Sequence, residues 1–248
     1  MEFPQQNRLI NRKMNNNQFL LSIIIPAKNE LENLKILINE IIHELPHDLD
    51  YEIIIVNHNS TDKTAQYLHK LEMKENILRV ININNEKYLF GPVMKYAFQK
   101  SKGGLILTMD GDLSHLAKFI PDFLRCLKKG SDVVIGGRYQ KNQRPFHPKS
   151  RFILIKLFNI FVKIFINSRI NDFTTGYRAF DRSLLKEFDL ISSHLNFHLE
   201  LNIKLIRHAK NPTDIPIRYQ KRRYGSSKFD YTFLFIQYLK SLFWGLFG

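Results

Sequence analysis

Hydrophobic and polar positions follow two alternating patterns along the first half of the chain. Short runs of leucine and β-branched residues stop abruptly at polar residues, which is typical of strands buried on both faces. Between these runs, apolar residues recur every three or four positions, the spacing of a helix with one buried face. We expect strands at 21–25, 52–56, 77–83 and 104–109, and helices at 31–45, 62–73 and 92–100. This alternation predicts an α/β fold with a mostly parallel central sheet flanked by helices.

Polar residues gather where these strands end, which is where open α/β sheets bind their ligands. The loops concerned are 26–30, 57–62, 84–87 and 110–112. The last loop places Asp110 and Asp112 on either side of one glycine, directly after an apolar strand. Two carboxylates this close repel each other, and a hard divalent ion such as Mg²⁺ or Mn²⁺ offsets the repulsion. On spacing alone, a solvated Asp-Gly turn is the alternative, because both residues favour turns.

Charge is the unusual feature of the composition. The 248 residues include 37 Lys and Arg against 23 Asp and Glu, a formal net charge of +14. Such a charge attracts polyanions, namely nucleic acids, anionic lipid headgroups or phosphate-rich substrates. No nucleic-acid-binding motif accompanies it, so we expect no nucleic acid as a partner.

Cysteine content and the N-terminus bear on the compartment. Cys126 is the only cysteine, which excludes an intrachain disulfide and fits a reducing compartment. Residues 1–20 form a polar extension without the apolar core of a secretory signal. Both features indicate a cytoplasmic protein.

Six motifs follow one another in order along the chain. They occupy residues 23–30, 56–64, 109–115, 136–139, 172–180, and 215–217 together with 222–228. This order resembles the inverting family 2 glycosyltransferases, and within them the dolichyl-phosphate mannose synthases and related polyprenyl-phosphate glycosyltransferases. The resemblance covers residues 21–228 and implies a glycosyltransferase A-type, Rossmann-like fold. It also implies a nucleotide-sugar half over about 21–115 and an acceptor half over 116–228.

The resemblance implies a metal-dependent, inverting transfer of a sugar from a GDP- or UDP-sugar to a polyprenyl (dolichyl or undecaprenyl) phosphate. In this reading, Asp110, Asp112 and Ser114 hold Mg²⁺ or Mn²⁺ beside the donor diphosphate. The residues implied in donor binding are Pro26, Ala27, Lys28, Glu30, Asn57, His58, Lys87, Asp110, Arg138, Arg222 and Lys228. The residues implied in binding the acceptor phosphate are Arg138, Arg151, Arg178, Arg222, Ser227 and Lys228.

Two further acids, Glu200 and Asp172, complete the implied catalytic set beside the carboxylate pair. With a hydroxyl acceptor on a glycan, lipid or protein, either acid could be the general base. A phosphate acceptor needs no base, because its nucleophilic oxygen is already ionised. The alternative for Glu200 is an ion pair with nearby arginines.

Asn57 and His58 stand where relatives usually carry two consecutive aspartates. The loss of these carboxylates removes acceptors for hydrogen bonds from the base and ribose of a nucleotide, and leaves open which nucleotide binds. Two other classes of protein stay open as alternatives, the first because of Asn57 and His58 and the second because of the net charge of +14. One is a catalytically degenerate, membrane-binding module, and the other is a basic nucleic-acid-binding protein.

Two segments have too few polar residues for an ordinary surface helix. The polar residues of segment 152–167 form one narrow stripe: Lys156, Asn159, Lys163 and Asn167. We expect this helix to lie in a membrane interface with its lysines toward lipid phosphates, the alternative being a buried helix pair or an oligomer contact. Residues 229–248 repeat the pattern as an apolar, amphipathic C-terminal helix. An anionic membrane surface is thus an expected partner, which places the protein peripherally on the inner face of the cytoplasmic membrane, and a homo-oligomer stays open.

Overall fold

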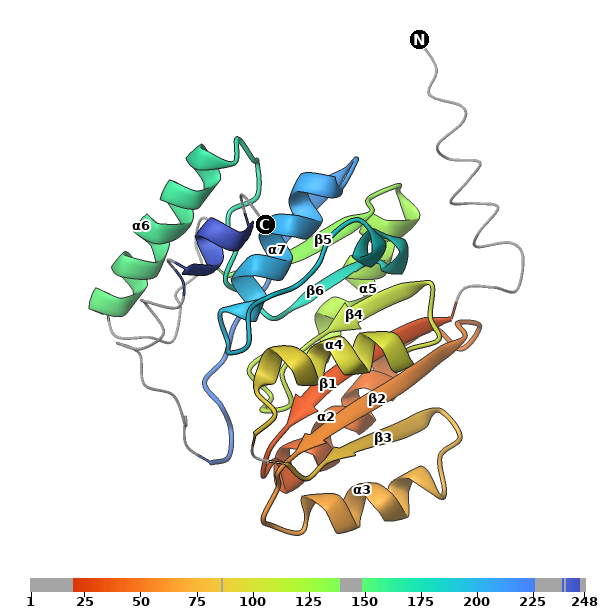
Figure 1. Cartoon of the computed structure of the whole chain (residues 1–248). Coiled ribbons are helices and arrows are strands. Elements are labelled where there is room, and N and C mark those ends of the chain that lie inside the picture. Colours follow the sequence, from red (N-terminus) through yellow and green to blue (C-terminus); the bar gives the residue numbers. More distant parts are fainter. Residues whose placement is uncertain (1–19, 86, 139–148, 226–237, 239, 246–248) are drawn as a thin grey trace.

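A mixed sheet of seven strands forms the centre of the computed structural model, which describes residues 20–85, 87–138, 149–225, 238 and 240–245 (Figure 1). The spatial order is β3-β2-β1-β4-β6-β5-β7. In chain order the strands are β1 (Leu21–Ala27), β2 (Tyr51–His58), β3 (Leu78–Ile83), β4 (Leu105–Thr108), β5 (Val133–Gly137), β6 (Arg178–Asp181) and β7 (Pro212–Pro216). Strand β6 runs antiparallel to β4 and β5, whereas the other neighbours pair in parallel. The start of β6 therefore lies at the sheet edge where β4 and β5 end.

Helices cover both faces of the sheet. Their bounds are α2 (Leu31–Glu44), α3 (Thr64–Glu72), α4 (Phe90–Lys100), α5 (Ile120–Lys128), α6 (Lys149–Phe165) and α7 (Phe197–His208), with short 3₁₀ turns η1 (Ala117–Phe119) and η2 (Arg182–Lys186). Helices α4 and α7 lie on the face turned to the viewer in Figure 1, and α2 and α5 lie behind it. Helix α6 lies outside α7, away from the sheet.

The sheet separates two hydrophobic cores, because successive side chains of a strand point to opposite faces. Ile23 and Ile25 of β1 belong to the core under α2 and α5. Ile24 between them belongs to the core shared with α4 and α7. All three are fully buried, as expected for a strand covered on both faces.

The elements expected from the hydrophobic pattern are confirmed to within a few residues at each end. The expected α/β architecture with a mostly parallel sheet is confirmed as well. Among the described residues, no helix combines the length and the apolar character needed to cross a membrane.

Helix α6 turns Asn159 and Lys163 toward the protein and a row of apolar residues outward. Asn159 is 2% exposed; its Oδ1 accepts the Phe173 N–H at 2.7 Å, and its Nδ2 donates to the Ile155 carbonyl at 3.0 Å. Lys163 Nζ donates to Asn171 Oδ1 at 2.6 Å. The expectation that the lysines of this helix point to lipid phosphates is therefore wrong for Lys163, which is tied to the protein.

The outward side of this helix is the apolar face of α6. Its seven large apolar side chains are 44–75% exposed: Ile153, Leu154, Leu157, Ile160, Phe161, Ile164 and Phe165. A helix usually buries such a stripe against its own domain. The described part of this protein leaves it uncovered.

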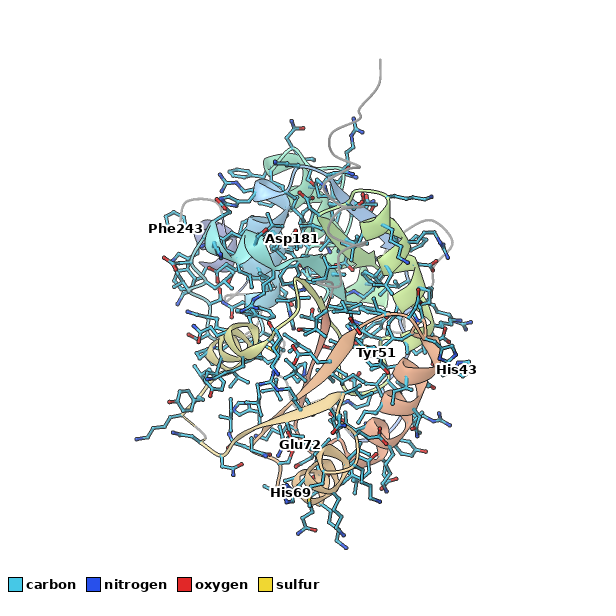
Figure 2. The ribbon with its side chains drawn as sticks, turned by 90° about the vertical axis from the view of Figure 1, so that its right-hand side faces the viewer. His43, Tyr51, His69, Glu72, Asp181 and Phe243 are labelled. Carbon is cyan, nitrogen blue, oxygen red and sulfur yellow. The ribbon has the colours of Figure 1, made fainter. Side chains whose placement is uncertain are left out.

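The described part of the C-terminal segment has the same reversed polarity. Ser241 is fully buried; its Oγ lies 2.6 Å from Ser192 Oγ and accepts from Asn196 Nδ2 at 2.7 Å. Phe243, by contrast, is 61% exposed, and Figure 2 shows its side chain at the outer surface, on the opposite side of the molecule from His43 of α2. The Arg207 guanidinium donates to the Gly245 carbonyl at 3.0 Å, which ties this segment to α7.

Candidate active site

Polar segments from both halves of the chain meet at the sheet edge where β1, β2, β4 and β5 end. The antiparallel direction of β6 adds the segment that precedes it, residues 171–177, to this edge. Gly111 allows the turn after β4 to approach β1 closely, because a Cβ at this position would lie 3.0 Å from the Pro26 carbonyl oxygen.

The turn after β4 is fixed by His115. The Asp110 N–H donates to His115 Nδ1 at 3.0 Å, so the ring is neutral with its proton on Nε2. The ring is 1% exposed and stacks on Tyr177 with centroids 4.9 Å apart. Burial lowers the pKa of His115, which keeps the ring neutral. Sequence reasoning found no role for this lone histidine, although its place just after the carboxylate pair was a usable signal.

The two carboxylates of the turn have different surroundings. The Asp110 side chain is 35% exposed, and its pKa is raised, chiefly because the surrounding protein keeps water away and also because Asp112 is negative. Asp112 Oδ1 accepts the Ser114 N–H at 3.0 Å. Asp112 Oδ2 lies 3.2 Å from Arg222 Nε. The carboxylate of Asp112 is thus held by one backbone amide and one guanidinium, whereas that of Asp110 faces His115 at 3.6 Å.

Residues 219–224, here called the strap, lie along this turn. The Gln220 N–H donates to the Ser114 carbonyl at 3.1 Å, and the Arg223 N–H donates to the Asp112 carbonyl at 3.4 Å. Tyr219 pairs with His115 in an antiparallel bridge. The strap therefore brings the first part of the basic C-terminal motif next to the carboxylates.

Arg222 of the strap joins two acids from opposite ends of the site. Its Nη1 lies 2.9 Å from Glu30 Oε1, and its Nε lies 3.2 Å from Asp112 Oδ2. Asn33 Nδ2 donates to Glu30 Oε2 at 2.6 Å and to the Tyr224 carbonyl at 3.2 Å, so the strap is also tied to α2. Glu30 and Arg222, both expected in donor binding, do lie together.

Arg138 is held by Asp172 rather than standing apart from it. Arg138 Nε and Nη2 donate to the two carboxylate oxygens of Asp172 at 2.7 and 3.0 Å. Asp172 is fully buried and also accepts the Thr174 N–H at 3.1 Å. The charge and hydrogen bonds of Arg138 hold the pKa of Asp172 below its usual value despite burial. The arrangement argues against Asp172 as a general base and makes it the residue that orients Arg138.

Arg178 lies in the protein interior, contrary to the expectation that it binds the acceptor phosphate. Its side chain is 1% exposed and donates from Nη1 to Asn202 Oδ1 at 2.8 Å, with His198 Nδ1 against Nη2. Burial lowers the pKa of Arg178 to about 9, while the charges of Asp110 and Asp172 act in the opposite direction. Arg178 is therefore a buried counter-charge near Asp110.

Glu200 is likewise enclosed, which corrects its expected catalytic role. It is fully buried, and its two oxygens accept the N–H groups of Ile191 and Ser192 at 2.8 and 2.7 Å. Lys204 Nζ lies 3.2 Å from the same carboxylate. Glu200 thus anchors the loop before α7, and its partners are amides and a lysine rather than arginines.

The donor loops after β1 and β2 are tied to each other by Asn29. Its Oδ1 accepts the Thr61 N–H at 2.7 Å and its own N–H donates to Ser60 Oγ at 2.9 Å. Pro26 and Ala27 lie beside Val56 and Asn57 in the β1–β2 pairing. Lys28 and Lys87 are exposed at the ends of β1 and β3.

Asn57 and His58 bring no negative charge to this loop. Asn57 is fully buried, and its Nδ2 donates to Asn82 Oδ1 at 2.8 Å. Burial lowers the pKa of His58, which favours a neutral ring. The part of the chain that the structure describes offers no hydrogen-bond partner to Asn57 Oδ1 or His58 Nε2.

The residues at the turn suit a hard divalent ion. Asp110 and Asp112 offer carboxylate oxygens, the ligands that Mg²⁺ and Mn²⁺ prefer, and the negative charge of two neighbouring carboxylates is one that a cation would neutralise. Ser114 is fully buried beneath the strap, which argues against its hydroxyl as a third ligand. Asp110 and Asp112 would hold such an ion, which would supply positive charge for phosphate oxygens at this edge of the sheet.

Three of the expected phosphate-binding residues are not placed by the structure. Arg151 belongs to α6, but its side chain lies outside the described residues, as do Ser227 and Lys228 entirely. Their roles stay predictions.

Comparison with known proteins decides the family. The model of glycosyl transferase family 2 matches residues 22–189. The chain belongs to this family. A family 2 relative from Pyrococcus furiosus, a dolichol-phosphate mannosyltransferase, is 30% identical over 230 residues, which cover 90% of this chain and 62% of the relative. A polyprenol monophosphomannose synthase from Mycolicibacterium smegmatis is 26% identical over 233 residues, or 91% of this chain and 87% of the relative. The chain thus spans less than two thirds of the first of these.

Solved structures agree with the fold of family 2. Glucosyl-3-phosphoglycerate synthase from Mycobacterium tuberculosis, solved with Mn²⁺, UDP and glucosyl-3-phosphoglycerate, has a TM-score of 0.67 at 16% identity over 99% of this chain and 85% of its own. S. aureus TarS 1-349 in complex with UDP-GlcNAc has a TM-score of 0.59 at 21% identity over 84% and 60%. At these identities the likeness concerns the fold alone, and the expected glycosyltransferase A-type fold is confirmed.

Proposed function

We propose that this protein transfers a sugar from a nucleotide sugar to a polyprenyl phosphate, with inversion at the anomeric carbon, and that it works peripherally on the cytoplasmic face of a membrane. Two relatives point to this acceptor, since one is named a dolichol-phosphate mannosyltransferase and the other a polyprenol monophosphomannose synthase. The family match and the ordered strand-end residues support the nucleotide-sugar donor.

The donor half of the proposal rests on the turn after β4. Asp110 and Asp112 would hold Mg²⁺ or Mn²⁺, which acts as a Lewis acid on the departing diphosphate. Glu30 lies on the far side of Arg222 from Asp112, where a ribose hydroxyl could donate to it. Arg138 lies close enough to Asp110 to act on its charge, and it adds a positive charge for phosphate oxygens.

The contacts of the two candidate bases, Asp172 and Glu200, are the observation that favours a phosphate acceptor. A hydroxyl nucleophile needs a general base within reach. Asp172 is committed to Arg138 with a lowered pKa, and Glu200 is enclosed by backbone amides and Lys204. A phosphate oxygen is already ionised at neutral pH and needs no such group. The geometry therefore favours a phosphate acceptor over the hydroxyl alternative.

The apolar face of α6 supports a lipid carrier for that phosphate. Seven uncovered apolar side chains on one helix fit an interfacial helix lying in the headgroup region. The net charge of +14 favours anionic headgroups in addition. A polyprenyl phosphate would reach the site from such a surface with its chain still in the lipid.

Transfer by the purified protein tests the proposal. GDP- and UDP-sugars are offered with Mn²⁺ and either a polyprenyl phosphate or the matching polyprenol in anionic vesicles, and the products are identified by mass spectrometry. We expect product from the phosphate only, in one of the two nucleotide series. Product from the polyprenol alone would show that the acceptor is a hydroxyl group. The absence of product in every combination would contradict the proposed transfer reaction.

The variant Asp112→Asn tests the role of the carboxylate pair. The amide oxygen can still accept the Ser114 N–H, so the fold should persist, while transfer should fall by about 100-fold or more because a metal ligand is lost. Asp122→Asn is the matched control, since Asp122 is a surface acid that pairs with the exposed Arg125. Full activity of Asp112→Asn in the presence of a chelator would overturn the mechanism.

A further inference from the structure

Arg222 lies between Asp112 and Glu30, the carboxylates proposed above to bind the metal ion and the nucleotide. Its guanidinium bridges Asp112 Oδ2 and Glu30 Oε1 at 3.2 and 2.9 Å. The side chain is only 22% exposed, so water screens these charges poorly compared with a surface ion pair.

Both oxygens of Asp112 already have a donor. Oδ1 accepts the Ser114 N–H, and Oδ2 accepts from Arg222 Nε. A divalent ion that binds Asp112 must share this carboxylate with a fixed positive charge a few ångström away. The two cations repel, so metal binding weakens the Arg222 pair, and the Arg222 pair weakens metal binding.

The strap keeps Arg222 in this position. Its backbone makes three hydrogen bonds that fix the chain on both sides of the arginine. Gln220 bonds to Ser114, Arg223 bonds to Asp112, and Tyr224 bonds to Asn33. Rotation of the long side chain can still release Asp112 without moving the strap. The chain then needs another anion for the guanidinium, because a half-buried charge without a partner is costly.

We infer that Arg222 competes with the divalent ion for Asp112, and that the diphosphate of the donor ends the competition by taking over the guanidinium. This inference rests on the proposed function, because it assigns the ion and the nucleotide sugar to the same site. Arg222 is here a positioning residue that couples the two ligands: the ion alone binds weakly, and the ion together with a nucleoside diphosphate binds well.

This competition predicts that removing the positive charge of Arg222 strengthens the binding of the metal ion. In Arg222→Gln, Mn²⁺ alone should bind about tenfold more tightly than in the unmodified protein, because the competing charge is gone. The tightening of Mn²⁺ binding by added GDP or UDP should shrink by a similar factor. An arginine that serves only to bind phosphate would leave the affinity for Mn²⁺ alone unchanged.

Arg223→Gln is the matched control. It removes one positive charge from the neighbouring residue, whose guanidinium lies over the Tyr224 ring. Its backbone N–H, which bonds to Asp112, is retained. We expect Mn²⁺ affinity close to that of the unmodified protein, which separates a local competition from a general effect of net charge.

The measurement is a Mn²⁺ titration followed by electron paramagnetic resonance of the free ion, with and without GDP or UDP, on the three full-length proteins and on Arg222→Lys. The lysine variant keeps the charge but cannot bridge both acids, so its affinity for Mn²⁺ should lie between those of the unmodified protein and Arg222→Gln. It replaces Arg222→Gln if circular dichroism shows that the glutamine variant does not fold. Equal or weaker Mn²⁺ binding in Arg222→Gln overturns the inference while leaving the proposed function intact. Failure of the unmodified protein to bind Mn²⁺ even with either nucleotide would contradict the proposed function itself.

Discussion

His115 holds the carboxylate turn through the hydrogen bond that its Nδ1 accepts from the Asp110 N–H. A proton on Nδ1 would abolish this hydrogen bond, because two N–H donors would then face each other. The ring is buried, and burial lowers its pKa. His198 and His58 are also held neutral, chiefly by burial, with lowered pKa values.

These three histidines make the stability of the protein depend on pH in a definite direction. In the unfolded chain they take up protons below about pH 6.5, whereas in the folded protein they resist protonation. The unfolded state therefore binds more protons, and stability falls as the pH decreases from 7.5 to 5.5. The raised pKa of Asp110 acts in the opposite direction, because a carboxyl group that binds its proton more tightly in the folded protein favours folding as the pH falls.

We expect a net loss of about 1–3 kcal/mol in the free energy of unfolding between these pH values, measured by urea denaturation. His115→Gln keeps an acceptor for the Asp110 N–H but cannot be protonated, so its free energy of unfolding should fall less between pH 7.5 and 5.5. Stability that rises on acidification, or an identical slope in both proteins, would contradict this account.

Individual site residues were only partly predictable from the sequence. Asp110, Asp112, Glu30 and Arg222 come together as expected, because strand ends and the basic motif are visible in the chain itself. The partners of Asp172 and Glu200 were not predictable. They depend on contacts such as those from Arg138 and from the amides before α7, which form only when distant elements pack.

At the scale of elements, α6 shows what hydrophobic periodicity can and cannot predict about a helix. The helix expected over 152–167 is present as Lys149–Phe165, so Asn167 of the expected stripe lies beyond its end, and Lys156 is exposed whereas Asn159 is buried. Periodicity does not say which face is buried, and hydrophobicity suggested the wrong answer for Lys163. Asn159 and Lys163 face inward because backbone and amide groups of residues 171–173 require partners there.

A pair of substitutions on α6 tests this reversed polarity. Asn159→Ala leaves the buried Phe173 N–H without its acceptor and should cost about 1–3 kcal/mol of stability. Ile164→Ser, at a position that is 75% exposed, should change stability by less than about 0.5 kcal/mol. Urea denaturation of both variants gives the comparison. Greater destabilisation by the serine variant would mean that the apolar face is packed against protein after all.

At the scale of the whole molecule, the apolar face of α6 and the net charge should act as separate contributions to membrane binding. Exposed charges are screened by salt, whereas burial of apolar side chains in lipid is not. We expect binding to anionic vesicles to weaken by about tenfold between 0.1 and 0.5 M salt without vanishing.

Vesicle sedimentation measures this, with neutral vesicles as the lipid control and Ile164→Ser as the protein control. The serine variant should lose the part of the binding that survives high salt. Complete loss of binding of the unmodified protein at high salt would leave the apolar face without the role proposed for it.

The sheet was predictable only in its first half. Strands β1 to β4 alternate with helices, so their order and direction follow from the pattern and from the handedness of crossovers. The insertion of the antiparallel β6 between β4 and β5 was not predicted. It depends on residues 171–181 returning to a sheet edge that the earlier strands had already built.

This insertion bears on how the chain is made. Strand β4 pairs with β1 on one side, but its other edge waits for β6. From the end of β4 at Thr108 to the start of β6 at Arg178 the ribosome must add about 70 residues, which takes roughly 4–14 s at the usual 5–20 residues per second. During that interval the nascent protein presents a bare β-edge next to two unneutralised aspartates, so it should depend on chaperones more during synthesis than after release.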